Sequence, residues 1–137
     1  MEGTHLTRSA KETLELGKAF ACSLKNGDIV VLEGRLGAGK TVFAKGIAAG
    51  LGVEEEVTSP TFTLLKEYAG RLTLRHFDFY RIADAQELSE TGLYDSLGGD
   101  GVCVIEWAPR QLPPHIKVSL RVTGENERLI EISRAGE

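Results

Sequence analysis

The chain has 137 residues, of which 16 are Lys or Arg and 20 are Asp or Glu, so its formal net charge is −4. This length allows one domain with a hydrophobic core, and we expect residues 1–137 to form a single domain. A hydrophobic fraction of 42% and a charged fraction of 26% exclude an intrinsically disordered chain. The acidic balance, with a pI near 5.5, argues against a protein that holds nucleic acid through a broad basic face.

The apolar runs are all far shorter than the roughly 18–20 residues that a membrane span needs. The first residues, MEGTHLTRSAKETLEL, lack the charged-then-apolar layout of a signal peptide. We therefore expect a cytoplasmic protein without a membrane partner. Cys22 and Cys103 are too few for a disulfide framework or a zinc site, and each has apolar neighbours, so both are predicted to be buried and reduced.

The first half of the chain predicts two helices around one strand. Ser9 and Glu12 form an S-x-x-E capping box at the start of the first helix. The nearly continuous apolar run over 28–33 favours a strand covered on both faces, as in a parallel sheet. A glycine-rich loop follows, and the spacing over 41–51 predicts a helix that stops at a glycine.

The second half predicts strands for the most part. Residues 61–68 and 72–79 are typical of a hairpin, and a short helix is predicted over 84–93. The run 102–106 is another fully apolar strand, and alternating residues over 116–123 and 129–132 predict a closing pair of strands. This order predicts an α/β fold with a mainly parallel sheet, antiparallel hairpin additions and helices on both faces.

Residues 34–41, GRLGAGKT, match the phosphate-binding pattern G-x-x-x-x-G-K-[ST] at every fixed position. An apolar strand precedes the loop and a helical pattern follows it, which predicts a P-loop NTPase-like fold. Backbone N–H groups of such a loop point at phosphate oxygens, and the helix N-terminus adds partial positive charge. We expect Lys40 near the β- and γ-phosphates and the Thr41 hydroxyl on Mg²⁺. The other phosphate-facing positions are Gly37, Ala38, Gly39 and Val42.

A P-loop site also needs an acidic residue at the end of a neighbouring strand. The run 102–106 ends in Glu106, and the run 74–78 ends in Asp78. By pattern, Glu106 is the better metal ligand and Asp78 the better group to orient the attacking water; a solvated strand-end carboxylate stays open for both. His76 shares a face with Asp78 and is predicted to be structural.

Four segments in this order resemble one family: the P-loop, TSPTF over 58–62, HFDFYR over 76–81 and IEW over 105–107. Together they resemble the bacterial TsaE (YjeE) family, over about residues 9–133. Those proteins are small P-loop ATPases needed for the threonylcarbamoyladenosine modification of tRNA. The resemblance implies ATP and Mg²⁺ binding, slow hydrolysis and assembly with the TsaD and TsaB proteins, with tRNA met only through that assembly.

The resemblance also implies roles for individual residues. Lys40, Thr41 and Glu106 would act at the phosphates and the metal, and Asp78 would support hydrolysis close to that metal. The segment 58–62 would act as a switch that senses the γ-phosphate. Thr58, Ser59 and Thr61 of this segment are predicted switch or partner positions, and so are Tyr80 and Trp107. Ser9 and Arg128, at the two ends of the domain, would close over the nucleotide base.

One position departs from the family, which usually has Asp where this chain has Arg35. The phosphate-binding positions are unaffected, and an exposed partner contact is the feature put in doubt.

A small-molecule kinase is an alternative function, but the arginines after the P-loop form no lid-like cluster. A GTPase is another, although the chain lacks an N-K-x-D motif. A nucleotide-dependent adaptor without useful turnover also stays open.

Overall fold

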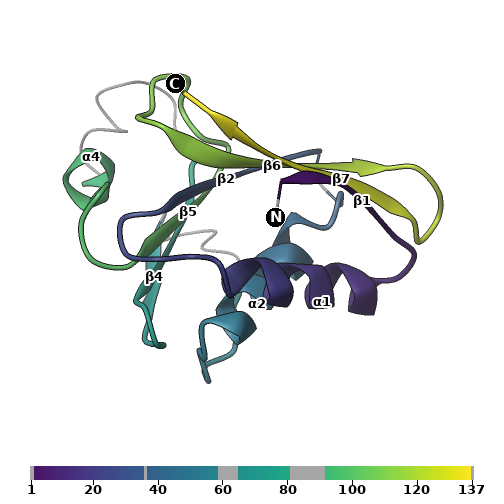
Figure 1. Cartoon of the computed structure of the whole chain (residues 1–137), viewed down its shortest axis with the longest axis horizontal. Coiled ribbons are helices and arrows are strands. Elements are labelled where there is room, and N and C mark those ends of the chain that lie inside the picture. The colour runs from purple at the N-terminus through teal and green to yellow at the C-terminus, as the bar shows by residue number, and fades with distance from the viewer. Residues whose placement is uncertain (1, 36, 59–64, 81–91, 137) are drawn as a thin grey trace.

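The computed structural model describes residues 2–35, 37–58, 65–80 and 92–136 (Figure 1). Its strands form one seven-stranded sheet with the order β1-β7-β6-β2-β5-β4-β3. The strands are β1 (Gly3–Thr7), β2 (Ile29–Glu33), β3 (Leu65–Tyr68), β4 (Leu74–Asp78), β5 (Val102–Glu106), β6 (His115–Val122) and β7 (Arg128–Ala135). The helices are α1 (Ala10–Ala21), α2 (Lys40–Gly50) and α4 (Leu93–Ser96).

The middle of the sheet is parallel. Strand β2 pairs in parallel with both β5 and β6, and β4 pairs in parallel with β5. The outer pairs β1–β7, β6–β7 and β3–β4 are antiparallel. This arrangement confirms the predicted fold class, and it places the carboxyl ends of β2, β4 and β5 at one edge, where ligands bind in open α/β sheets.

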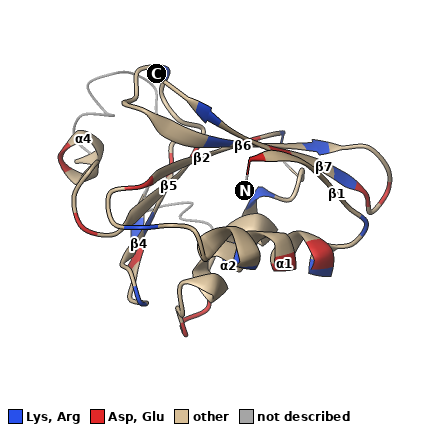
Figure 2. Ribbon diagram, viewed as in Figure 1, with Lys and Arg blue, Asp and Glu red and all other residues tan. Residues whose placement is uncertain are grey.

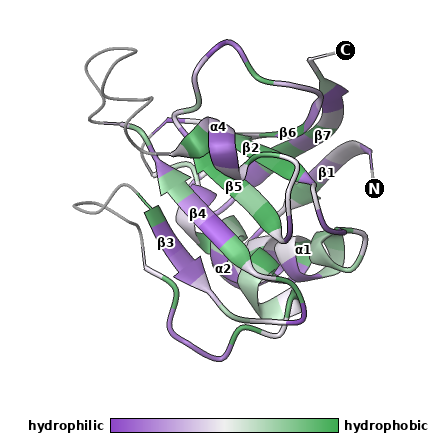
Figure 3. Cartoon of the chain, turned by 90° about the vertical axis from the view of Figure 1, so that its left-hand side faces the viewer, coloured by the Kyte–Doolittle hydropathy of each residue, from purple (hydrophilic) through white to green (hydrophobic). Residues whose placement is uncertain are grey.

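Charged residues of both signs are interspersed along the ribbon (Figure 2), whereas the central strands are apolar. β2 and β5 are the green strands in the middle of Figure 3, and both are buried along almost their whole length. Such strands need cover on both faces. One hydrophobic cluster lies under α1 and α2, and a second, around Phe77 and Ile105, lies under α4. Helices therefore cover both faces, as predicted.

Helices α1 and α2 pack closely on one face of the sheet (Figure 1). A Cβ atom on Gly17 would lie 2.5 Å from the carbonyl oxygen of Phe43, and one on Gly46 would lie 3.0 Å from Gly17 Cα. The rings of Phe20 and Phe43 are 5.7 Å apart beside this crossing. The glycines let the two backbones meet, which fixes the position of the N-terminus of α2 against the sheet.

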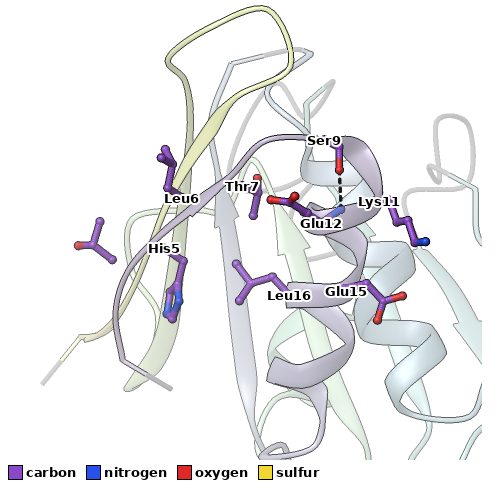
Figure 4. Close-up of a pocket in the computed structure, with 9 residues that line it drawn as sticks. His5, Leu6, Thr7, Ser9, Lys11, Glu12, Glu15 and Leu16 are labelled. Atoms are coloured by element: carbon purple, nitrogen blue, oxygen red, sulfur yellow. Dashed lines mark hydrogen bonds between the residues drawn. The ribbon is translucent and has the colours of Figure 1, made fainter.

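The capping box at the start of α1 is confirmed. The Ser9 Oγ accepts a hydrogen bond from the Glu12 backbone N–H at 3.0 Å (Figure 4). In return the Glu12 side chain accepts one from the Arg8 backbone N–H at 2.9 Å. The first bond satisfies a donor that the first turn of a helix leaves open, and the second ties the residue before the N-cap to that turn.

Most predicted boundaries agree with the structure to within a few residues, but two features differ. Strand β1 was not predicted, because its sequence GTHLT has little apolar alternation and it is held to β7 by backbone pairing. The one-turn helix α4 was not predicted either, and residues 84–91 of the helix predicted there lie outside the described residues. Residues 61–64 of the predicted hairpin also lie outside them.

The prediction that both cysteines are buried is wrong for Cys22. Cys103 is buried in the middle of β5, but Cys22 is exposed at the C-cap of α1. Its apolar neighbours belong to the buried face of the helix, and the helical turn carries Cys22 away from that face. In the described part of the chain, none of the helices is both long and apolar enough to cross a membrane.

Candidate functional site

The glycine-rich loop connects β2 to α2 at the carboxyl edge of the parallel strands. Gly39 is the N-cap of α2 with φ 100°, and Gly37 has φ 82°, so both occupy backbone conformations that favour glycine. Because a glycine N-cap has no side chain, it leaves the first N–H groups of the helix for another acceptor. An anion is the natural acceptor at such a site. Leu36 lies outside the described residues.

The first glycine of the loop is required by a close approach. A Cβ atom on Gly34 would lie 2.6 Å from the carbonyl oxygen of Leu120 in β6 and 3.1 Å from the Ala38 Cβ. The loop therefore turns directly against the neighbouring strand. A glycine at this position lets the chain fold back toward α2.

Lys40 begins α2 and is only 5% exposed. Its Nζ lies 3.9 Å from the centroid of the Trp107 ring, a cation–π contact. Burial lowers the pKa of Lys40, while the charges of Glu106 and Asp78 act in the opposite direction. The ammonium is thus held away from water between an aromatic ring and two carboxylates.

Trp107 and Tyr80 form an aromatic pair at the mouth of this site. Their ring centroids are 4.9 Å apart, and the two side chains are 38% and 55% exposed. Trp107 has φ 57°, the one non-glycine residue with positive φ among the described residues. Such a conformation costs on the order of 1–3 kcal/mol and is typical of functional sites.

Asp78 and Glu106 end two neighbouring parallel strands and are direct register partners. Glu106 is 3% exposed, so a solvated strand-end carboxylate does not describe it. Its Oε2 lies 2.6 Å from the His76 Nε2. Asp78 is half-buried, and its Oδ1 accepts a hydrogen bond from the Tyr80 backbone N–H at 3.0 Å. The sheet thus brings together the two acidic residues that were predicted from their positions at strand ends.

Within the described ranges, no group of three or more His, Cys, Asp or Glu side chains is arranged to hold a metal ion. The oxygen-bearing side chains of the candidate site are Thr41, Asp78 and Glu106. Mg²⁺ favours this chemistry, because it binds through one or two carboxylates together with phosphates and water. The residues present therefore fit a magnesium ion that arrives with a nucleotide.

Two small cavities flank the glycine-rich loop. One of about 240 Å³ is lined by Gly34, Lys40 and Trp107, together with Leu32 and Glu33 of β2 and with Ala108. The other, of about 80 Å³, is lined by Ser9, Ala10, Thr13, Gly39, Val42, Asn126 and Arg128. The second cavity brings together the two ends of the domain, as expected for Ser9 and Arg128. The Arg128 Nη2 also lies 3.5 Å from the carbonyl oxygen of Gly37.

A further cavity of about 850 Å³ lies between β1 and α1 (Figure 4). His5 and Leu16 line it, and Ser9 is the one candidate site residue among its lining residues. Lys40, Asp78 and Glu106 do not line it. Apart from Ser9, the described candidate site residues therefore lie away from this wider groove.

Within the predicted switch segment 58–62, only Thr58 is described. Its Oγ1 accepts a hydrogen bond from the Lys66 Nζ at 2.8 Å, and its backbone lies 3.4 Å from the Tyr68 hydroxyl. Thr58 is thus held against β3. Ser59 and Thr61 lie outside the described residues.

Sequence reasoning left three residues out of the site. His76 contacts Glu106, and the signal for it was its position two residues before Asp78 on one strand face. Thr13 and Asn126 line the cavity that contains Ser9. Thr13 lies four residues after Ser9, on the same side of α1, and this spacing could have placed it at the site. No sequence signal could have placed Asn126 there.

Comparisons with known proteins agree with this architecture. The family model described as "Threonylcarbamoyl adenosine biosynthesis protein TsaE" matches residues 7–131. The TsaE protein of Treponema pallidum is 47% identical over 132 residues, which cover 93% of this chain and 98% of the relative. The TsaE protein of Bacillus subtilis is 44% identical over 135 residues, which cover 95% of this chain and 84% of the relative.

A solved structure is similar as well. The crystal structure of Bacillus subtilis YdiB superposes with a TM-score of 0.84 at 38% sequence identity, covering 100% of this chain and 87% of that one. The family model spans most of the chain, and the curated relatives match it along almost their whole length. The chain therefore belongs to the TsaE family of threonylcarbamoyladenosine biosynthesis proteins.

Proposed function

We propose that this chain is a single-domain ATPase subunit of the tRNA threonylcarbamoyladenosine pathway in the cytoplasm, which binds MgATP and hydrolyses it slowly. The observation that carries the proposal is the position of Lys40. It begins the helix after the glycine-rich loop and lies close enough to Glu106 and Asp78 to feel both charges. A cation beside a phosphate loop, facing two carboxylates, is the arrangement that phosphoryl transfer requires.

Each part of the site has a distinct role in this proposal. The amides of Gly37, Ala38, Gly39, Thr41 and Val42 bind the phosphates, and Lys40 neutralises charge on the β- and γ-phosphates. The Thr41 hydroxyl, Glu106 and Asp78 would hold Mg²⁺. The ion would supply charge stabilisation at the transferred phosphate. Asp78 orients the attacking water, and Ser9 and Arg128 close over the base.

The aromatic pair adds a reason for slow turnover by the free chain. In the structure the Lys40 ammonium rests on the Trp107 ring, which Tyr80 supports. Phosphate binding requires Lys40 to leave that ring. We place Trp107 and Tyr80, with the segment containing Thr58, Ser59 and Thr61, among the groups that respond to nucleotide or to a partner protein.

By family resemblance, the partners are TsaD and TsaB, and tRNA is met only through that assembly. The decisive experiment measures ATP hydrolysis by this chain alone and with the TsaD–TsaB pair. We expect slow hydrolysis by the free chain and faster hydrolysis in the presence of the pair. Hydrolysis that the pair leaves unchanged contradicts the proposed partnership.

A test of the nucleotide site uses Lys40→Ala and Thr41→Ala in calorimetric titrations with ATP at several Mg²⁺ concentrations. We expect Lys40→Ala to abolish measurable binding and Thr41→Ala to raise the Mg²⁺ concentration needed for it. Lys45→Ala, on the exposed side of α2, is the matched control and should bind as the wild-type chain does. Unchanged binding by Lys40→Ala contradicts the site.

The adaptor alternative is separated from the ATPase by turnover. Asp78→Ala and Glu106→Ala should bind ATP but hydrolyse it at least tenfold more slowly, because they remove groups that act on water and metal. If hydrolysis is intact in both variants, the catalytic roles are wrong.

Labelled ATP offered with a panel of metabolites tests the kinase alternative, which predicts transfer of phosphate to an acceptor other than water.

A further inference from the structure

A buried histidine–carboxylate pair lies within the candidate site. The His76 Nε2 and the Glu106 Oε2 are 2.6 Å apart, and the two side chains are 1% and 4% exposed. The residues come from neighbouring parallel strands, in which His76 is the register partner of Val104 and Asp78 that of Glu106. The imidazole therefore reaches diagonally across the sheet toward the carboxyl end of β5.

The pair lies on the side of the sheet that carries the P-loop helix. Leu74 and Val104 belong to the hydrophobic cluster under α1 and α2, whereas Phe77 and Ile105 belong to the cluster on the other face. Alternation along β4 and β5 puts His76, Asp78 and Glu106 on the face of Leu74 and Val104. Lys40, the first residue of α2, feels the charge of Glu106 on this same side.

The other nitrogen of the imidazole makes no competing contact. The His76 Nδ1 is buried and has no hydrogen-bond partner in the described part of the chain. In a hydrogen bond between an imidazole nitrogen and a carboxylate oxygen the N–H is the donor, so Nε2 donates to the Glu106 Oε2. This bond engages one carboxylate oxygen, and Oε1 stays outside it.

We infer that His76 is a positioning residue, which fixes the Glu106 carboxylate so that its Oε1 faces the magnesium ion of a bound nucleotide. This inference rests on the proposed function. His76 itself touches neither nucleotide nor metal, and it acts by removing the rotational freedom of the carboxylate. Hydrogen bonds of this kind to a ligating group typically change metal affinity or activity by about 10–100-fold.

The test compares two substitutions of His76, one that keeps a hydrogen-bond donor toward Glu106 and one that removes it. In His76→Gln the amide nitrogen reaches the place of Nε2, whereas in His76→Leu the volume is kept and the donor is lost. We expect His76→Leu to need about 10–100-fold more Mg²⁺ for half-maximal tight ATP binding in calorimetry. The ATP affinity of His76→Leu in excess EDTA should stay at the wild-type value. We call the dependence of tight ATP binding on Mg²⁺ concentration the Mg²⁺ response, and His76→Gln should recover most of it.

The matched control is His115→Gln. His115 lies at the amino end of β6, the opposite edge of the sheet from the P-loop, and its Nδ1 lies 2.9 Å from the carbonyl oxygen of Pro113. Its Mg²⁺ response should be that of the wild type. Should His76→Leu fail to fold by circular dichroism, His76→Asn replaces it, because an asparagine amide reaches the place of Nδ1 and not that of Nε2.

A double substitution tests whether His76 acts through Glu106. In a Glu106→Gln background, the His76→Leu change should cause no further loss of Mg²⁺ response, because residues that act as a unit are non-additive. An equal additional loss in both backgrounds overturns the inference, as does a folded His76→Leu variant with wild-type Mg²⁺ response. Failure of the wild-type chain to bind ATP refutes the proposed function and this inference together.

Discussion

The P-loop lysine, Lys40, is a buried cation. Burial lowers the pKa of Lys40 from 10.5 despite two nearby carboxylates. The protonated side chain therefore costs stability at neutral pH, and this cost is relieved as pH rises through the lowered pKa toward 10.5. In the proposed function the lysine binds phosphate at a cost in stability, which is common at functional sites.

Lys40→Met is expected to lose ATP binding without losing stability. Methionine keeps the length of the side chain and removes the desolvated charge, so its free energy of unfolding at pH 7 should equal or exceed that of the wild type. The advantage should shrink as pH rises toward 10.5, since the wild-type lysine then loses its proton. Denaturant unfolding at pH 7 and at pH 10 measures this. A loss of more than about 1 kcal/mol, a typical cost of a disruptive substitution, contradicts the argument.

The two cysteines are expected to differ in reactivity. Burial raises the pKa of the Cys103 thiol, which lies inside β5, whereas Cys22 is exposed at the end of α1. Since the thiolate is the reactive form, iodoacetamide should label the native chain at Cys22 alone. Mass spectrometry of Cys22→Ser and Cys103→Ser variants checks this. Fast native labelling of the Cys22→Ser variant is the result that contradicts it.

How much of the site the sequence predicts depends on the distance along the chain between the residues involved. The P-loop and the Ser9–Glu12 capping box were predictable because each is a local spacing with a local cause. The contact of His76 with Glu106 joins residues 30 positions apart. It requires the register of β4 against β5, which no pattern within either strand encodes.

At the scale of elements, the crossing of α1 and α2 depends on glycine. Gly17→Ala is expected to destabilise the fold by about 1–3 kcal/mol, because its Cβ would meet the Phe43 carbonyl oxygen at 2.5 Å. The higher helix propensity of alanine, worth about 1 kcal/mol, works against this loss. Chemical denaturation measures the balance.

Glu15→Ala, on the exposed side of α1, serves as the control and should stay within about 0.5 kcal/mol of the wild type. The Gly17→Ala variant should also bind ATP more weakly, because the crossing positions the N-terminus of α2. A variant as stable as the wild type shows that the helices can separate without cost.

Elements with a strong hydrophobic pattern were predicted well, and those without one were not. β2 and β5 are apolar on both faces, and β6 alternates along its length, so each pattern predicts a strand. β1 lies at the edge of the sheet with mostly exposed side chains, including Leu6 at 44%. Its pairing with β7 comes from backbone hydrogen bonds, which any sequence can make.

For the molecule as a whole, charge decides how it meets nucleic acid. The net charge is −4, and residues of both signs are interspersed along the ribbon (Figure 2). The isolated chain is therefore expected to bind tRNA weakly, with a Kd above about 10 μM at physiological salt. Electrophoretic mobility shifts at two salt concentrations check this expectation. Submicromolar, strongly salt-dependent binding contradicts it and indicates direct contact with the tRNA backbone.

The indole that rests on the P-loop lysine also gives the molecule an internal optical probe. Trp107 is the single tryptophan of the chain, and the emission of an indole responds to a charge 3.9 Å from its ring. Any ligand that draws the ammonium away should shift or dequench that emission. Rapid mixing of the unlabelled protein with a nucleotide would then follow the arrival of the ligand on the millisecond scale, with no dye attached.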